Sequence, residues 1–390
     1  MTSKYYMPTR VIIGDDCITK NSELFIALGK KALIVTGAKS AKRNGSENDV
    51  KTALESVGIN YLVFDKVMSN PTIACVYEGA ALAKENDVDF IIAIGGGSPM
   101  DAGKAIALLA AQTIEKENLF SGNYGNKVLP MAFVPTTAGT GSEVTQYSIL
   151  TNDQAQTKTS IASELLFPTV TFLDAKYTEH LGVTTTINTA IDALSHAVEG
   201  MLSVRASNVS DALAVAGIRM IMNCVPTMLQ ALQSGSELMF NLKQREQLLQ
   251  AALMAGMVIA QTGTTAVHAM GYSLTYFKDI DHGRANGLLL GVYLNLVEKV
   301  QPDLAARILE AMNFSKAEQF RELLNKLLGE KEEITSEEIE QYSKLAVQTK
   351  NITNSVVKPT EEDIRTMYTL SFAKVQTRRQ HDGNNSNDNW

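Results

Sequence analysis

Cysteine is scarce in this chain, and dense basic segments are missing. The three cysteines, Cys17, Cys75 and Cys224, are widely spaced and odd in number. A disulfide framework or a cysteine metal site needs paired or clustered cysteines, so the sequence predicts neither, and a reducing cytoplasm suits it. The net charge is −7 and no stripe of Lys and Arg is visible. A nucleic acid is therefore not an expected partner.

Long apolar segments and an export signal are also lacking. Residues 1–16 contain no apolar stretch followed by a small-residue cleavage site, so no secretory signal is predicted. Apolar runs such as 288–297 are much shorter than the ~20 residues that a membrane span requires. We therefore expect a cytoplasmic protein that is not inserted in a membrane.

The composition that remains is that of a packed globular protein. Hydrophobic residues make up 45% of the chain and charged residues 20%, so a large core can form. At 390 residues the chain is longer than a typical single domain. Two domains are expected, and two domains favour a cleft between them.

The pattern along the chain divides it into two halves. Short β-rich runs alternate with helical segments up to residue 175, which predicts a parallel sheet wound with helices. The predicted strands are 10–13, 31–35, 61–64, 90–94, 131–134 and 170–173. Long helical patterns follow at 207–222, 243–260, 287–300 and 336–348. We predict an α/β domain over residues 1–180 and an all-α domain over 181–375. Residues 376–390 have almost nothing to bury and are predicted to be a disordered tail.

A glycine-rich turn follows the predicted strand 90–94. From Gly95 the chain reads GGGSPMD, and a helix beginning at Pro99 is predicted, with Ser98 as its N-cap and Asp101 in a capping box. The N–H groups at that helix start would face a turn whose backbone a pyrophosphate can approach closely. The alternative is a turn needed only for tight packing of strand against helix.

A second polar loop makes the nucleotide interpretation stronger. PTTAGTGSE, from Pro135, also follows a predicted strand and offers several hydroxyl groups. Two such loops at strand ends form the usual nucleotide site of an open α/β sheet. Because the first loop is not the common G-x-G-x-x-G pattern, composition alone leaves the cofactor open.

Candidate metal ligands lie in the helical half. Asp192 and His196 are one helical turn apart in the apolar stretch TAIDALSHAVEG, so they share one face of a helix. A surface ion pair is the ordinary explanation for such spacing, but this stretch is too apolar for a solvated face. His268, on a predicted helix, and His282, after a loop, could complete a site for Fe²⁺ or Zn²⁺ with open positions for a substrate oxygen.

Together these stretches resemble the iron-containing, group III, alcohol dehydrogenase family, which includes lactaldehyde reductases, propanediol dehydrogenases and butanol dehydrogenases. The resemblance spans nearly the whole chain. It rests on SNPT from Ser69, GGGSPMDAGKAIA from Gly95, PTTAGTGSEVT from Pro135, IDALSHAVEG from Ile191, and the spacing of His268 and His282. It implies the fold shared with dehydroquinate synthases, in which an α/β dinucleotide-binding domain with a parallel sheet precedes an all-α metal-binding and substrate domain.

The resemblance also implies roles for individual residues. Asp192, His196, His268 and His282 match the metal ligands of the family, with Fe²⁺ expected and Zn²⁺ as an alternative. The residues predicted to bind the dinucleotide are Gly37, Asn70, Gly96, Gly97, Ser98, Asp101, Thr136, Thr137, Thr140 and Lys158. His268, His282 and Tyr272 are the catalytic candidates, and Tyr147, Ile259 and residues 351–355 are expected to shape the substrate pocket.

Two positions depart from the family pattern. Tyr272 stands where many members have a histidine that relays a proton, and tyrosine could relay a proton or simply pack. Gly37 stands where NAD-using members place an acid, with Lys39, Lys42 and Arg43 nearby. A 2′-phosphate would meet cations there, so we predict a preference for NADP(H), with NAD(H) as the alternative.

The predicted reaction is hydride transfer between a nicotinamide dinucleotide and a small primary alcohol or aldehyde, with the metal stabilising charge on the substrate oxygen. A homodimer or larger homo-oligomer is implied by the resemblance. Two alternatives stay open from the sequence. One is a glycerol dehydrogenase or other polyol oxidoreductase of the same fold, and the other is a dinucleotide-binding protein that has lost catalysis.

Overall fold

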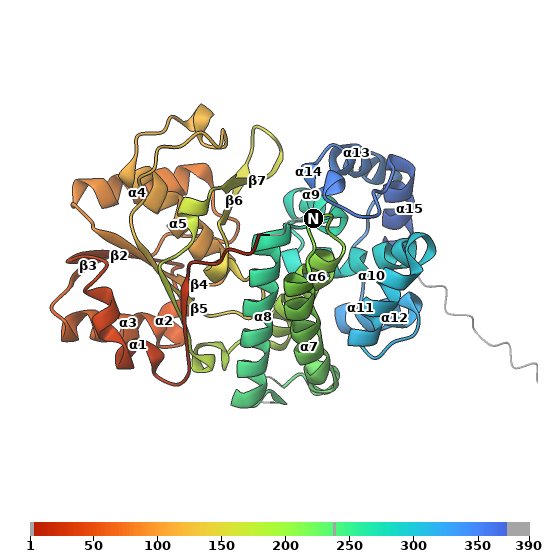
Figure 1. Ribbon diagram of the computed structural model, residues 1–390, viewed down its shortest axis with the longest axis horizontal. Helices are drawn as coiled ribbons and strands as arrows, with labels where there is room; N and C mark the ends of the chain where they lie inside the picture. The colour runs from red at the N-terminus through yellow and green to blue at the C-terminus, as the bar shows by residue number, and fades with distance from the viewer. Residues whose placement is uncertain (1–3, 237–238, 373–390) are drawn as a thin grey trace, which may run out of the picture.

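The computed structural model describes residues 4–236 and 239–372. The predicted tail at 376–390 lies outside these residues. The chain forms an α/β half and a helical half that lie side by side (Figure 1). This arrangement confirms the predicted fold class, a parallel-sheet α/β domain followed by an all-helical one.

A six-stranded parallel sheet organises the first half. Its order is β1-β8-β5-β4-β2-β3, and every neighbouring pair in it is parallel. The strands are β1 (Arg10–Ile13), β2 (Lys31–Thr36), β3 (Asn60–Phe64), β4 (Phe90–Gly95), β5 (Met131–Pro135) and β8 (Val170–Leu173). The central strands β2, β4 and β5 are almost wholly buried, which is why they read as continuous apolar runs in the sequence.

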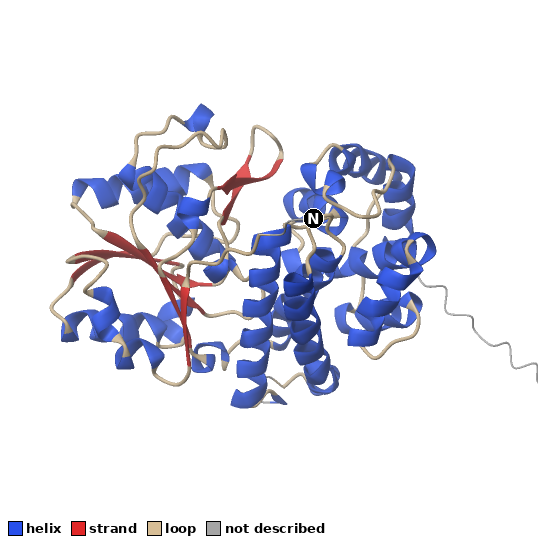
Figure 2. Ribbon diagram, viewed as in Figure 1, coloured by secondary structure: helices blue, strands red, loops and turns tan. Residues whose placement is uncertain are grey.

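Helices cover both faces of this sheet, as Figure 2 shows. One face packs against α1 (Cys17–Lys20), α2 (Ser40–Arg43) and α3 (Ser46–Ser56). The other face packs against α4 (Ile73–Glu85) and α5 (Gly97–Ala111). Because β2, β4 and β5 are parallel, the loops after them open at the same edge of the sheet.

An antiparallel hairpin of β6 (Tyr147–Asn152) and β7 (Thr157–Ala162) stands beside α5 and was not predicted from the sequence. Its strands are rich in Ser, Thr and Lys and are only partly buried, so they lack the apolar runs that marked the other strands. Short 3-10 turns complete the half: η1 (Ser22–Phe25), η2 (Lys116–Asn118), η3 (Ser142–Val144), η4 (Glu164–Leu166) and η5 (Ala175–Thr178).

The second half is helical throughout the part of it that the structure describes. Its helices are α6 (Val183–Met201), α7 (Asn208–Ser234), α8 (Leu242–Thr262), α9 (Ala266–Lys278), α10 (His282–Val300), α11 (Pro302–Ala311), α12 (Ala317–Leu328), α13 (Ser336–Val347), α14 (Lys350–Thr353) and α15 (Glu361–Phe372). The four helices predicted from the sequence correspond to α7, α8, α10 and α13. The helix predicted at 207–222 is too short, because α7 continues through Pro226 to Ser234.

Among the described residues, α7 alone is long and apolar enough to cross a membrane by length and composition. The expectation that every apolar stretch is too short is therefore wrong for this helix. A stripe that includes Ala214, Ile218, Ile221 and Val225 is buried in the common core with α6 and α8. Helices of protein cores pass the same length test, so this one helix is weak evidence for a span.

Candidate active site

The site is a cleft of about 820 Å³ between the two halves. One wall consists of the loops after β4 and β5, with the β6–β7 hairpin, and the other consists of α6, α9 and the start of α10. The edge of the sheet where a nucleotide is expected thus faces the helices that carry the candidate metal ligands.

The glycine turn after β4 is closely packed against the second polar loop. A Cβ on Gly96 would lie 2.9 Å from Thr137 Oγ1, and one on Gly97 would lie 2.8 Å from Thr140 Cγ2. Helix α5 begins at Gly97 with Gly96 as its N-cap, so the prediction of a start at Pro99 capped by Ser98 is wrong. The turn leaves room for backbone N–H groups at the end of a helix dipole, which favours a phosphate there.

Ser98 and Asp101 make other contacts instead of capping. Ser98 Oγ accepts a hydrogen bond from the backbone N–H of Asn70 at 3.2 Å. Asp101 accepts one from Ser142 Oγ at 2.6 Å and one from the N–H of Ile149 at 3.2 Å, so it ties α5 to the hairpin rather than forming a capping box. Sequence rules for helix starts fail here because a loop from elsewhere in the fold competes for the same side chains.

Lys158 reaches the cleft from β7. Its Nζ donates to Asn70 Oδ1 at 2.7 Å, and Asn70 has a positive φ of 58°, a conformation that asparagine tolerates better than most residues. Burial lowers the pKa of Lys158 to about 8. A buried amine beside the glycine turn is suited to an anionic group of a dinucleotide.

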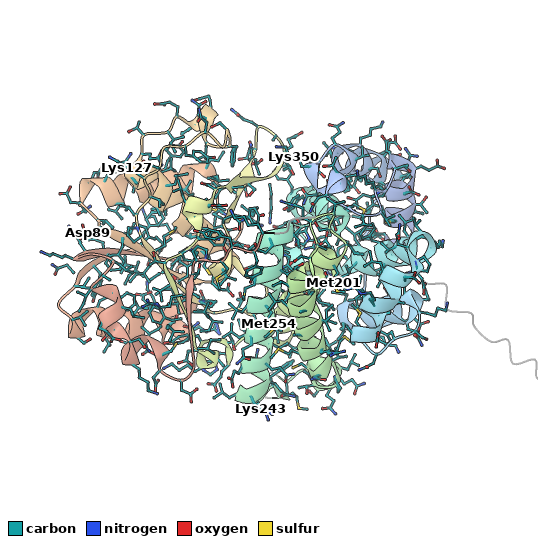
Figure 3. All side chains as sticks on the ribbon, in the orientation of Figure 1. Asp89, Lys127, Met201, Lys243, Met254 and Lys350 are labelled. Carbon is teal, nitrogen blue, oxygen red and sulfur yellow. The ribbon has the colours of Figure 1, made fainter. Side chains whose placement is uncertain are left out.

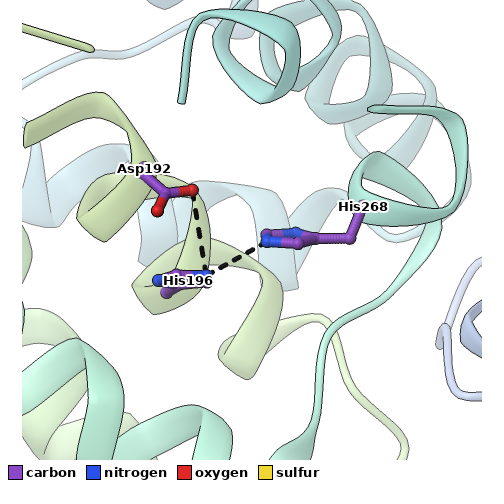
Figure 4. Close-up of side chains that lie close together, drawn as sticks. All are labelled: Asp192, His196 and His268. Atoms are coloured by element: carbon purple, nitrogen blue, oxygen red, sulfur yellow. Dashed lines mark hydrogen bonds and ion pairs between the residues drawn. The ribbon is translucent and has the colours of Figure 1, made fainter. Parts of the chain in front are cut away.

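The four predicted ligands converge on one side of the cleft. Asp192 and His196 share a face of α6, His268 lies in the first turn of α9, and His282 begins α10 (Figure 4 shows the first three). The Nε2 atoms of His196 and His268 are 3.0 Å apart, and Asp192 Oδ1 lies 3.9 Å from Nε2 of both His196 and His282. Ligand atoms of Asp192, His196 and His268 therefore lie within 4.8 Å of one another, and His282 approaches the same carboxylate from α10.

The protonation states favour a bound cation at that point. Burial lowers the pKa of His196, and lowers that of His282 further, so both rings are neutral with a lone pair available. Burial raises the pKa of Asp192, but His196, His282 and His268 when protonated, with a hydrogen bond from Asn286, together lower it by more, so the carboxyl stays ionised. Ligand atoms of buried side chains crowd together here, and a divalent ion would suit them.

Two further residues hold this cluster and were not predicted from the sequence. Glu199 is fully buried on α6, pairs with Nδ1 of His268, and accepts hydrogen bonds from the N–H groups of Thr265 and Val267. Asn286 Nδ2 lies 3.1 Å from Asp192 Oδ1 and 3.2 Å from His268 Nε2. Glu199 had a sequence signal, because it lies on the same face of α6 as the two predicted ligands.

Tyr272 stands one helical turn after His268 and stacks on His282, with ring centroids 5.9 Å apart and planes 9° apart. Burial raises its pKa well above the ordinary range for tyrosine, so the hydroxyl is protonated at neutral pH. The ring thus supports one of the predicted ligands directly.

The predicted dinucleotide residues divide into two groups. Eight of them line the cleft: Asn70, Gly96, Gly97, Ser98, Asp101, Thr137, Thr140 and Lys158. Gly37 and Thr136 lie outside its lining; Thr136 is buried, and its N–H donates to the carbonyl of Gly95. Tyr147, Ile259 and Asn351, which were expected to shape the substrate pocket, also line the cleft.

Comparison with known proteins agrees with this geometry over both halves. Residues 8–175 match the family described as iron-containing alcohol dehydrogenase, and residues 186–372 match its C-terminal part. The chain belongs to the iron-containing alcohol dehydrogenase family. The resemblance seen in the sequence is therefore confirmed, and this alcohol dehydrogenase is an oxidoreductase that uses a nicotinamide dinucleotide.

Individual relatives cover most of this alcohol dehydrogenase. A 1,3-propanediol dehydrogenase from Citrobacter freundii is 36% identical over 293 residues, 73% of each chain. An NAD-dependent methanol dehydrogenase from Bacillus methanolicus is 30% identical over 288 residues, again 73% of each chain. The crystal structure of an iron-containing alcohol dehydrogenase from Thermotoga maritima has a TM-score of 0.88 and 36% identity, covering 96% of this chain and 100% of that one.

Proposed function

We propose that this dehydrogenase interconverts a small primary alcohol and its aldehyde at a divalent metal held by Asp192, His196, His268 and His282. Fe²⁺ is the expected ion, and the same ligand set accepts Zn²⁺. The observation that carries the proposal is the cluster of Asp192, His196 and His268, with His282 beside Asp192, in the same cleft that the glycine turn lines.

The residues of the chain would divide the work between them. A metal ion, when bound, supplies Lewis-acid stabilisation of negative charge that develops on the substrate oxygen. The turn at Gly96 and Gly97 and the start of α5 bind phosphate, and the dinucleotide carries the hydride. Tyr147 and Ile259 line the cleft, where their side chains would reduce the access of water to a bound substrate.

NADP(H) is the dinucleotide that the residues after β2 favour. Gly37 brings no carboxylate to the place where a ribose 2′-phosphate would lie, and Lys39 and Arg43 are exposed beside it. Lys42 is less available, because its Nζ lies 2.7 Å from Asp65 Oδ2. The Bacillus methanolicus relative is named NAD-dependent, so this preference rests on residues 37–43 of this chain and not on the family.

The test combines metal analysis with an aldehyde panel. Purified enzyme should contain Fe²⁺ or Zn²⁺ and should oxidise NADPH at 340 nm with small aldehydes, faster than it oxidises NADH. Chelation should remove most of the activity, and the metal should restore it. His282→Ala should lower metal content while dinucleotide affinity, followed by fluorescence, changes little, because His282 belongs to the helical half.

Dinucleotide binding by His282→Ala serves as the control for correct folding of the α/β half. Wild-type turnover in a chelated His282→Ala preparation would refute the ligand assignment. Comparable rates with both dinucleotides would refute the NADP(H) preference alone. Cytoplasmic location and assembly as a homodimer remain predictions from the sequence.

A further inference from the structure

A fixed arginine, Arg205, lines the cleft beside Asn354, one of the residues expected to shape the substrate pocket. Arg205 lies between α6 and α7, in a segment that is hydrogen-bonded to residues 354–356, which follow α14. The N–H of Val204 donates to the carbonyl of Asn354 at 2.9 Å, and the N–H of Val356 donates to that of Leu202 at 2.8 Å. The backbone that carries Arg205 is therefore held against the helical half on both sides.

The side chain of Arg205 is also oriented. Its Nε donates to Asn354 Oδ1 at 3.1 Å, and Asn354 is itself fixed by donating from Nδ2 to the carbonyls of Thr262 and Thr264 at 2.9 Å each. A Cβ on Gly263 would lie 2.3 Å from Arg205 Nη2, so the guanidinium occupies space that only glycine leaves open. Arg205 lines the same cleft as the candidate metal ligands.

No acidic side chain among the described residues forms an ion pair with Arg205. Lys350, at the start of α14, lines the same cleft on the side facing the β6–β7 hairpin (Figure 3). Like Arg205, it forms no ion pair with the described residues. Both side chains are exposed and accessible. Two cations without acidic partners thus stand beyond the candidate metal centre.

Four acids of the cleft influence Lys158 rather than Arg205. Asp101, Asp192, Asp279 and Asp281 each act to raise the pKa of Lys158, against the larger effect of its burial. Arg205 instead influences Tyr147: burial raises the pKa of that tyrosine, and the charge of Arg205 acts to lower it. Lys158 therefore has acidic neighbours in the cleft, whereas Arg205 and Lys350 form no ion pair among the described residues.

We propose that the natural substrate is an aldehyde, or the matching alcohol, that carries a second, anionic group, a carboxylate or a sulfonate, bound by Arg205 with help from Lys350. The proposal rests on the proposed function, because the aldehyde group must lie at the candidate metal centre while the anion reaches the arginine. A guanidinium held at Nε keeps its two Nη groups for paired hydrogen bonds to two oxygens of such an anion.

The experiment compares aldehydes that differ only in charge. The ratio of kcat/KM for 4-oxobutanoate over 4-oxobutanamide should be about 10 or more in the wild type, since a charge-assisted hydrogen bond is worth about a factor of ten or more. Arg205→Met should lower that ratio about tenfold. Lys350→Met should lower it less, and Arg205→Lys should restore part of it. Exposed Arg219 on α7 lies outside the cleft, so Arg219→Met should leave the ratio unchanged.

Two further measurements separate the outcomes. Butanoate should inhibit competitively more strongly than butanamide, and Arg205→Met should abolish that difference. 3-Oxopropane-1-sulfonate in the same assay distinguishes a sulfonate from a carboxylate substrate. Equal kcat/KM for charged and neutral aldehydes, or an equal loss for both in Arg205→Met, would overturn the inference and leave the proposed function intact. Failure of every aldehyde despite bound metal would overturn both.

Discussion

At the scale of single residues, Tyr272 is the most informative departure from the family pattern. Its ring lies parallel to that of His282 and edge-on to that of His268, with centroids 6.2 Å apart in the second contact. Contacts with two imidazoles indicate that the ring fixes the orientation of ligands. A role of the hydroxyl as a proton relay would not by itself explain why the ring stacks on these imidazoles.

Replacing Tyr272 separates these two roles. Tyr272→Phe keeps the ring, so kcat/KM should stay within about threefold of wild type, whereas loss of a proton relay would lower it about 100-fold or more. Tyr272→Ala removes the stacked ring and should lower both metal content and kcat. The measurements are steady-state kinetics with an aldehyde over a range of pH and metal analysis of each variant. A large loss in Tyr272→Phe with full metal content would show that the hydroxyl acts in catalysis.

At the scale of elements, the position of α9 depends on a carboxylate from another helix. Glu199 of α6 accepts hydrogen bonds from backbone N–H groups at the start of α9 and also contacts Nδ1 of His268. The start of α9 has no side-chain cap of its own. One buried acid therefore both caps a helix and fixes the tautomer in which Nε2 of His268 is free to bind a metal.

Glu199→Gln should weaken metal binding by about 10- to 100-fold, because an amide cannot accept at every position that the carboxylate oxygens fill. Metal affinity measured by competition with a chelator is the decisive reading, and dinucleotide affinity should change little. Glu47→Gln is a matched control, since Glu47 is a buried acid of the α/β half. Unchanged metal affinity in Glu199→Gln would show that Glu199 only supports the helix.

Elements that bury an apolar run were predictable from the sequence, and those held by polar contacts were not. Strands β4 and β5 appear in the sequence as continuous apolar runs because both faces are covered. The β6–β7 hairpin has no such run, and its place depends on hydrogen bonds that Ser142 Oγ and the N–H of Ile149 donate to Asp101. The helix start predicted within residues 95–101 was wrong for the same reason, because contacts from distant loops determine where α5 begins.

At the scale of the whole molecule, the sequence indicated which residues form the site but not the contacts that hold those residues in place. The ligands belong to a family pattern that a reader can see in the chain. Arg205 and Asn286 lie in no such pattern, Glu199 is marked only by sharing a helix face with two ligands, and the contacts of all three arise only when helices pack. Lys104, a buried lysine of α5, is another residue whose role depends on packing.

Lys104 is fully buried where the α/β half meets the loop leading to the hairpin. Its Nζ donates to Ser142 Oγ at 2.8 Å, to Thr145 Oγ1 at 3.1 Å and to the carbonyl of Tyr147 at 2.8 Å. Burial lowers its pKa from 10.5 to about 8. The folded state therefore releases this proton before the unfolded state does as pH rises. Between these two values the unfolded chain binds more protons, so the contribution of Lys104 to stability increases with pH.

Comparison with Lys104→Met isolates that contribution. The free energy of unfolding of the wild type, relative to the variant, should grow by up to about 3 kcal/mol as pH rises from about 8 to about 10.5. Urea midpoints at about pH 7.5 and pH 10 measure it. Burial raises the pKa of nearby Glu143 to about 7, but that group acts in a lower pH window. Exposed Lys299→Met is the control and should show no such growth. A difference that is constant with pH would mean that Lys104 stays charged in the folded protein throughout, held by its three acceptors.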